Sequence, residues 1–365
     1  MTASSDQQTN RYSAFMGIAL LGFAATLAVL NPSTWIGSLA VPFTDGQWAG
    51  LYGKNFDKTL ALTQPAKDAF GTLSYIGFRE GRPGVLVGSD GWLFTDEEMA
   101  RLDTPRVAFA DKISFIRAAK AKAEAAGTQV IVALIPAKLR VYDDKAGRYG
   151  FMPKLAPVYT ETVTNLQGRG VPVVDLLGPF VENRSKTQLF LRTDTHWTPQ
   201  GAEIAAREVA KSVMKAGLLA GEPASGEFVL KEGSPKEHRG DLLAFLPLLD
   251  VAGPKAPAPD FIRTGEAVER PPAGTDAGDA LLGEDTLPVA LVGSSYSFDR
   301  RWQFEDQLKV ALRTDILNAA QEGQGPFKPM ADYLASAEFR EKPPRLVIWE
   351  IPERYLWAAA RMPRL

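Results

Sequence analysis

Apolar residues from about residue 107 onward fall alternately into short continuous runs and into positions with helical spacing. The short runs predict strands at 129–135, 171–175, 289–292, 315–318 and 345–350. The helical spacing predicts helices over 107–126, 158–167, 304–312 and 329–336. Strands that are apolar on both faces are typical of parallel sheets covered by helices on both sides. The pattern therefore predicts an α/β fold with a mostly parallel sheet and flanking helices.

Two segments depart from this alternation. The stretch from Val251 to Pro288 is rich in Pro, Gly and Ala without a clear period, and we interpret it as a long surface excursion within one domain. Ser13–Leu30 is an uncharged, mostly apolar run at the short end of what spans a bilayer, and it predicts one N-terminal transmembrane helix. We favour an uncleaved signal anchor, with a cleaved signal as the alternative. The chain thus divides into a tail and anchor at 1–35 and one domain at 36–365.

Composition narrows the class of protein. A formal net charge of -2 and the lack of a large basic block argue against a nucleic-acid-binding surface. A hydrophobic content of 45% is enough for one large core or two smaller ones. The absence of cysteine excludes disulfides, iron–sulfur clusters and thiol catalysis.

One of the two histidines, His196, follows an aspartate at a spacing of two residues. In an extended or turn-like segment the Asp194 carboxylate can reach Nδ1 of His196 and leave Nε2 free to accept a proton. Thr198 and Pro199 predict the N-cap and first residue of a helix directly afterwards. The segment is therefore either a catalytic base with its orienting acid or a helix-entry turn with a satisfied histidine.

A serine pair follows the short apolar strand at 289–292, in Gly293-Ser294-Ser295. A tight turn at the carboxyl end of a buried strand is where a nucleophilic serine is presented. Such a serine needs a base, and His196 is better placed than His238. Because His238 is flanked by charged residues, we expect it on the solvated surface.

Several further strings accompany these two blocks: Gly91-Trp92-Leu93-Phe94, Pro136-x-Lys138, Gly325-Pro326-Phe327 and Trp349-Glu350-Ile351-Pro352-Glu353-Arg354-Tyr355. Asp-x-His followed by Thr-Pro-x-Gly, with Gly-x-Ser at a strand end, resembles the SGNH (GDSL-type) hydrolase superfamily. In that superfamily the serine block comes first, whereas here the histidine block precedes it. This circularly permuted order, with the strings above, resembles the alginate O-acetyltransferase family of AlgJ and AlgX from about residue 80 to 358.

The resemblance implies an SGNH-like periplasmic enzyme that O-acetylates an exopolysaccharide and is held at the inner membrane by the N-terminal anchor. Asp194, His196 and Ser295 fall on the triad positions of that family. By the same resemblance, a multi-pass membrane acyltransferase delivers the acetyl groups to the protein. The expected chemistry is covalent acyl transfer through an acetyl-serine, with no metal and no cofactor.

Departures from the superfamily pattern leave some assignments open. Ser294 stands where the general pattern has Asp, so it remains a minor rival to Ser295 as the nucleophile. The Ser295 N–H and Gly323 are the candidate oxyanion donors, and no asparagine follows the last strand to supply a third. Arg354 and Tyr355 are candidate substrate-binding or substitute donor residues. Trp197 is predicted either to stack on a sugar ring or to belong to the core.

Three functions remain open at this level. The first is a polysaccharide O-acetyltransferase, and the second is an acetylesterase with the same triad, in which water accepts the acetyl group. The third is a non-catalytic subunit that binds polysaccharide or serves assembly. The intact Asp, His and Ser set argues against the third function, because a binding module needs no base beside a serine.

Overall fold

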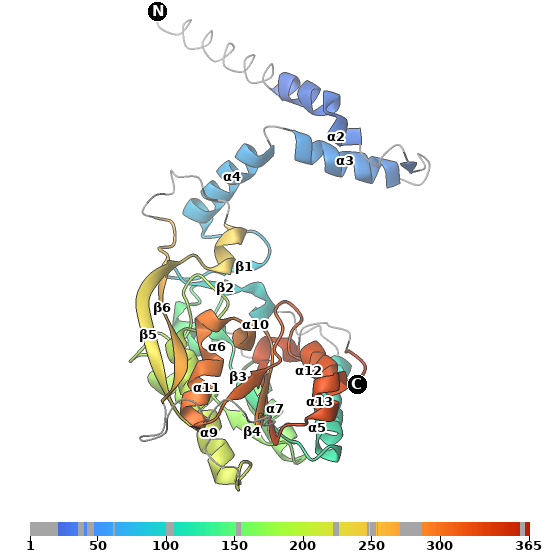
Figure 1. The fold of residues 1–365 in the computed structure, drawn as a ribbon. Coiled ribbons are helices and arrows are strands. Elements are labelled where there is room, and N and C mark those ends of the chain that lie inside the picture. Colours follow the sequence, from blue (N-terminus) through green and yellow to red (C-terminus); the bar gives the residue numbers. More distant parts are fainter. Residues whose placement is uncertain are drawn as a thin grey trace, which may run out of the picture. The chain divides into compact units, whose positions relative to one another are not determined.

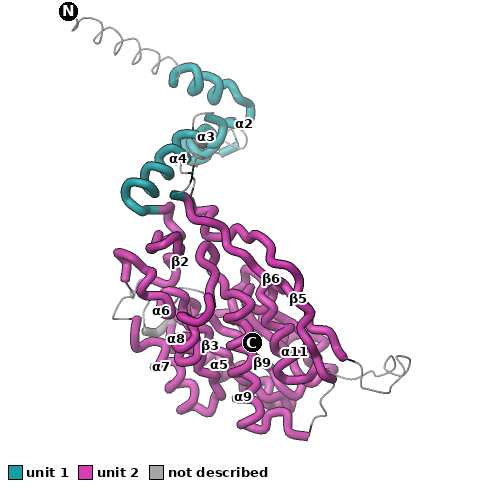
Figure 2. The backbone as a smooth tube through the Cα atoms, turned by 90° about the vertical axis from the view of Figure 1, so that its left-hand side faces the viewer, with its two compact units in different colours: residues 1–80, 246–255 teal, residues 81–245, 256–365 magenta. Residues whose placement is uncertain are grey.

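The computed structural model describes residues 21–35, 40–41, 47–60, 63–99, 106–150, 155–221, 226–246, 248, 253, 255–270, 287–357 and 362–365. The chain forms two compact units, one of residues 1–80 with 246–255 and one of residues 81–245 with 256–365 (Figure 2). The predicted division at residue 35 falls inside the first unit.

The first unit is helical in its described part. Its helices are α2 (Pro32–Trp35), α3 (Gln47–Thr59), α4 (Thr63–Leu73) and the π-helix Ser74–Phe78. Residues 21–30 are also helical, whereas residues 13–20 of the predicted anchor lie outside the described residues. Within the described ranges, none of the helices has both the length and the hydrophobicity that crossing a membrane requires.

The second unit is built on a five-stranded parallel sheet with the strand order β4-β3-β9-β7-β8. The strands are β3 (Gln129–Ile135), β4 (Val173–Asp175), β7 (Val289–Val292), β8 (Ile316–Asn318) and β9 (Leu346–Pro352). The predictions at 129–135 and 289–292 coincide with β3 and β7, and the other three differ from the observed strands only at their ends. The predicted α/β fold with a mostly parallel sheet is confirmed.

Alternate residues of each strand enter two different hydrophobic cores. In β3, Ile131 and Ala133 pack into one core and Val130 and Val132 into the other. Helices α9 (Pro199–Ala216) and α11 (Phe304–Leu312) cover the first face, whereas α5 (Arg106–Ala125), α7 (Ala156–Gln167) and α12 (Phe327–Ala335) cover the second (Figure 1). Burial on both faces explains why these strands are continuous apolar runs.

A two-stranded ribbon corrects one prediction. β5 (Glu227–His238) pairs antiparallel with β6 (Asp260–Arg270), which lies inside the stretch interpreted as a surface excursion. Most side chains of both strands are exposed, and cross-strand ion pairs such as Arg263 with Glu232 take the place of apolar contacts. The hydrophobic pattern therefore carried no strand signal here. The remaining elements of this unit are β1 (Val85–Val87), β2 (Leu93–Thr95), α6 (Lys138–Val141), α8 (Leu177–Asn183), α10 (Ser295–Phe298) and α13 (Ala337–Glu341).

The carboxyl ends of the central strands meet at one edge of the sheet. β9 lies between β3 and β7, with Ala133 opposite Glu350 and Val292 opposite Trp349. The segments that follow these strands therefore lie beside one another, which is where open α/β sheets place their sites.

Candidate active site

The serine turn, Gly293–Ser297, leaves the carboxyl end of β7. Ser294 caps α10, and Ser295 is the first residue of that helix. A Cβ atom at Gly293 would lie 2.4 Å from Oε2 of Glu350, so only glycine allows β9 to approach this closely. At a helix start the backbone N–H groups have no partner within the helix. The turn thus presents the Ser295 hydroxyl together with amide donors.

The side chain of Glu350, in β9, supports this turn through hydrogen bonds. Its fully buried carboxyl accepts hydrogen bonds from Ser294 N (2.7 Å), Ser294 Oγ (3.0 Å) and Ser297 Oγ (3.1 Å). Burial raises the pKa of Glu350 to about 7, although these hydrogen bonds oppose the rise. The Ser294 hydroxyl is thereby committed to Glu350, and Ser294 itself is buried. The geometry favours Ser295 over Ser294 as the nucleophile.

The histidine segment, Leu189–Trp197, is a narrow loop before α9. Leu191 N donates to His196 O over 3.1 Å, which closes the loop around Asp194 at its tip. Thr198 caps α9 by accepting from Gly201 N, and Pro199 opens the helix, which confirms the predicted helix start.

Buried polar groups from distant parts of the chain fix this loop. The Asp260 carboxylate of β6 accepts from Arg192 N (3.0 Å), Thr193 N (2.9 Å) and Thr193 Oγ1 (2.7 Å). The buried Lys138 ammonium donates to the Asp194 carbonyl over 2.9 Å. The loop therefore owes its shape to side chains that lie far from it in sequence.

Asp194, His196 and Ser295 form a continuous hydrogen-bonded row. His196 Nε2 lies 2.8 Å from Ser295 Oγ, and His196 Nδ1 lies 2.6 Å from Asp194 Oδ1. Burial favours the protonated form of Asp194, but hydrogen bonds from His196 and His238 outweigh it and hold the pKa of Asp194 well below its usual range. The carboxylate is thus ionised and turned toward the imidazole. This arrangement suits general-base activation of the serine.

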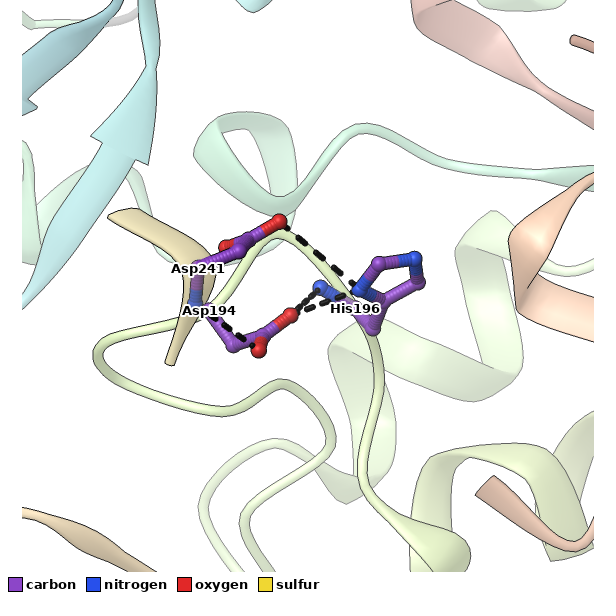
Figure 3. A group of neighbouring side chains, drawn as sticks. All are labelled: Asp194, His196 and Asp241. Atoms are coloured by element: carbon purple, nitrogen blue, oxygen red, sulfur yellow. Dashed lines mark hydrogen bonds and ion pairs between the residues drawn. The ribbon is translucent and has the colours of Figure 1, made fainter. Parts of the chain in front are cut away.

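A second carboxylate, that of Asp241, lies on the same side of the His196 ring as Asp194 (Figure 3). Its Oδ2 is 4.0 Å from His196 Nδ1 and accepts from Thr195 Oγ1 (2.6 Å), whereas its Oδ1 accepts from Thr195 N (2.9 Å). Asp194, His196 and Asp241 are spaced closely enough to ligate a cation. A cation there would displace N–H and O–H donors from both carboxylates, so we assign the three residues a hydrogen-bonding role.

His238 belongs to this site, and the expectation that it lies on the solvated surface is wrong. The residue is only 8% exposed, and its Nε2 lies 2.8 Å from Asp194 Oδ2. It ends β5, where Glu237 and Arg239 on either side are exposed and His238 turns inward. Charged neighbours therefore misled the prediction, and the strand offers no alternation that could have corrected it, since residues 231–237 are all exposed.

A cavity of about 500 Å³ lies next to His196 and Ser295. Ser295, His196 and three of the predicted residues, Gly323, Arg354 and Tyr355, line it. Gly323 reaches this place because Gln321 N donates to Gly293 O over 3.2 Å, which holds the segment after β8 against the serine turn. Four acidic side chains also line the cavity: Asp96, Glu97, Asp241 and Glu322.

Two aromatic residues behind the row have packing roles. Trp197 is 0% exposed and donates its indole N–H to Tyr296 O over 3.2 Å. It has no face on which a sugar could stack, so the substrate-binding prediction is wrong and the core alternative holds. Tyr296 donates its hydroxyl to Thr195 O and accepts from Arg354 Nη1 over 3.2 Å. The buried Arg354 therefore supports the histidine segment as well as lining the cavity.

The chain is similar in sequence to known proteins. Residues 85–353 match the family described as "SGNH hydrolase-like domain, acetyltransferase AlgX". The chain is 37% identical over 350 residues to the probable alginate O-acetylase AlgJ of Pseudomonas aeruginosa, covering 94% of this chain and 88% of that protein.

Two solved structures are similar to this one. The O-acetyltransferase domain of Pseudomonas putida AlgJ superposes with a TM-score of 0.68 at 35% identity, covering 77% of this chain and 94% of that domain. Pseudomonas aeruginosa AlgX superposes with a TM-score of 0.60 at 24% identity, covering 78% of this chain and 65% of AlgX. At this lower identity the AlgX comparison supports the fold alone.

Proposed function

The chain belongs to the AlgX-type family of SGNH hydrolase-like acetyltransferases, and we propose that it O-acetylates hydroxyl groups of an exopolysaccharide, alginate or a similar polymer. One observation carries the proposal. His196 Nε2 lies 2.8 Å from Ser295 Oγ, while Asp194 holds the opposite ring nitrogen at 2.6 Å. The AlgJ relatives, which are named as probable alginate O-acetylases, support the choice of reaction and polymer.

The first half of the reaction acetylates the enzyme. His196 Nε2 takes the proton of Ser295 as Oγ attacks the carbonyl carbon of an acetyl ester. The tetrahedral intermediate collapses when His196 returns that proton to the departing alcohol, which leaves the acetyl group on Oγ. Because hydrogen bonds hold the pKa of Asp194 low, this carboxylate stays ionised and stabilises the imidazolium formed in between.

The developing oxyanion needs donors beside Ser295. The Ser295 N–H starts a helix, and Gly323 lines the same cavity, so we assign these two groups to the oxyanion. Arg354 is the one lysine or arginine among the described residues that line the cavity, and with Tyr355 it is assigned to the substrate. Each preorganised donor of this kind contributes roughly a hundredfold or more to turnover.

The second half transfers the acetyl group to the sugar. A sugar hydroxyl gives its proton to His196 Nε2 and attacks the acetyl-serine, and His196 then reprotonates Ser295 Oγ. An acetylesterase would run the same steps with water as the acceptor, so exclusion of water separates the two activities. The formed row of Ser295, His196 and Asp194 argues against the non-catalytic alternative.

We place this reaction in the periplasm. The apolar run Ser13–Leu30 supports attachment to the inner membrane through a signal anchor, with a cleaved signal as the alternative. The acetyl groups would then come from a multi-pass membrane acyltransferase on the same membrane. N-terminal sequencing of the native protein distinguishes an anchor from a cleaved signal.

Incubation with an acetyl-ester donor, with and without oligomers of uronic acids, tests the proposed activity. The purified protein should release acetate slowly from the donor alone and should form acetylated sugar when oligomers are present, as followed by mass spectrometry. Acetate release that oligomers neither divert nor accelerate would identify an esterase instead. The Ser295→Ala protein provides the background rate.

A further inference from the structure

We propose that His238 is a positioning residue for the catalytic carboxylate, so that Asp194 is clamped between two histidines. The inference rests on the proposed function, because it assigns Asp194 the task of orienting His196. His196 Nδ1 bonds to Asp194 Oδ1 at 2.6 Å, and His238 Nε2 bonds to the other oxygen, Oδ2, at 2.8 Å. Each imidazole ring thus bonds to a different oxygen of the carboxylate.

Both oxygens of Asp194 have two donors each. Oδ1 accepts from His196 N (2.9 Å) and His196 Nδ1, and Oδ2 accepts from His238 Nε2 and from Asp241 N at 3.1 Å. Four donors fix both the position and the plane of the carboxylate. Since Asp194 is only 3% exposed, water does not readily replace a donor that is removed.

The tautomer of His238 follows from its second neighbour. Arg301 Nη1 lies 3.5 Å from His238 Nδ1, and a guanidinium group only donates. Nδ1 of His238 therefore accepts, which puts the ring proton on Nε2, facing Asp194 Oδ2. Arg301 is itself fixed by Asp299, whose Oδ2 lies 2.8 Å from its Nε. The position of the ring proton that His238 donates to Asp194 thus depends on Arg301 and, through Arg301, on Asp299.

One indole packs against both histidines. Trp302 stacks on His196 with ring centroids 4.9 Å apart and an interplanar angle of 17°, and it meets His238 edge-on at 5.5 Å and 87°. Trp302 is 1% exposed. The two imidazoles therefore share one rigid wall, and the carboxylate between them has little room to turn.

His238 acts through Asp194 and not on the substrate. The described residues that line the cavity include His196 and Ser295 but not His238. When the N–H of His238 is removed, Asp194 Oδ2 keeps a single donor, the amide of Asp241. The carboxylate then no longer holds Nδ1 of His196 in one orientation. Turnover should fall while binding of a small ester is preserved.

Two substitutions of similar volume test the proposal. His238→Gln can place an amide N–H where Nε2 stood, whereas His238→Leu fills the space without a donor. We expect His238→Leu to lower kcat on a model acetyl ester about 10- to 100-fold at unchanged KM, and His238→Gln to recover most of the loss. In an Asp194→Ala background the same His238→Leu change should cost less than about twofold. Arg239→Ala, an exposed neighbour, is the matched control.

The outcomes separate this inference from the proposed function. The role of His238 would be overturned if His238→Leu kept the wild-type kcat. It would also be overturned if His238→Gln lost as much kcat as His238→Leu, or if His238→Leu lowered kcat by the same factor in the Asp194→Ala background. Full activity in Ser295→Ala and Asp194→Ala would instead remove the proposed function itself. If His238→Leu does not fold, NMR of isotope-labelled wild-type protein decides. A ring proton on Nε2 that shifts in Asp194→Asn supports the clamp, and a proton on Nδ1 contradicts it.

Discussion

The serine turn and the histidine segment are joined by hydrogen bonds, among them the one between Ser295 and His196, but are held in opposite ways. The carboxyl group that supports the serine turn is partly protonated near neutral pH, since burial raises the pKa of Glu350 to about 7. Ionised carboxylates support the histidine segment. Although burial works against ionisation, hydrogen-bond donors lower the pKa of both Asp194 and Asp260. All three carboxyl groups are buried, but the kinds of donor differ: two of the three donors to Glu350 are hydroxyls, whereas N–H groups predominate at Asp194 and Asp260.

This contrast follows from how each half is built. The serine turn is local: a strand, a glycine and a helix start place Ser295, and Glu350 on the adjacent strand completes it. The histidine segment has no regular secondary structure of its own, so its backbone amides need partners from elsewhere. Asp260 supplies ionised acceptors for two of those amides. Loops of this kind depend on charge-assisted hydrogen bonds.

The largest expected effect comes from breaking the hydrogen bond between Ser295 and His196. Ser295→Ala and His196→Ala should each lower turnover of a model acetyl ester by at least about a thousandfold, and the double variant should be little worse, because the residues act as a unit. Steady-state kinetics on the three proteins measures this. Ser294→Ala is the matched control and should lose roughly tenfold or less, since it removes the cap of α10 and a hydrogen bond to Glu350 but keeps the Ser295 hydroxyl. Additive losses, or a dead Ser294→Ala protein, would count against the assignment.

A pH titration of stability tests the support of the serine turn. The pKa of Glu350 is raised from 4.5 to about 7, so between these values the folded protein keeps a proton that the unfolded chain has released. The contribution of Glu350 to the free energy of unfolding should therefore decline by about 3 kcal/mol as pH rises from about 4.5 to about 7. Glu350→Gln should lack this decline. Urea unfolding of both proteins across that range gives the difference, and parallel curves would show that Glu350 is not the titrating group.

The opposite pH dependence should mark the histidine segment. Donors hold the pKa of Asp260 below its usual 3.8, although burial opposes them, so its stabilisation is present above that pH and is lost as pH falls through the folded-state pKa. Asp260→Asn should lower the free energy of unfolding at neutral pH by about 2 kcal/mol, because a buried amide N–H replaces an acceptor. The gap to wild type should close in acid. Glu266→Gln, an exposed carboxyl on the same strand, is the control. A gap that is constant with pH would contradict the account.

The sequence predicted the parts of the molecule that depend on local pattern. Apolar runs located the parallel strands, Thr198 and Pro199 located the start of α9, and the glycine before Ser294 located the serine turn. Each of these features is encoded within about ten residues, so one sequence is enough to find it.

The missed features depend on contacts between distant segments. His238 is 44 residues from Asp194, and nothing in its charged surroundings shows that the ribbon of β5 and β6 turns it inward. Trp197 was open to two interpretations because burial of a single indole beside a helix start has no local signature. Asp260 lies in a stretch without a hydrophobic period, so its role became visible only with the fold.

Trapping the acetyl-enzyme tests the central claim, that Ser295 carries the acetyl group between donor and sugar, most directly. The protein is mixed with an acetyl-ester donor, quenched in acid within the first turnover and digested, and the peptides are sequenced by mass spectrometry. The account predicts one acetyl group on Ser295, absent in His196→Ala and lost to acetylated sugar when uronic-acid oligomers are added before the quench. Acetylated sugar formed at the wild-type rate with no acetyl group on Ser295, or with the group on Ser294, would contradict it.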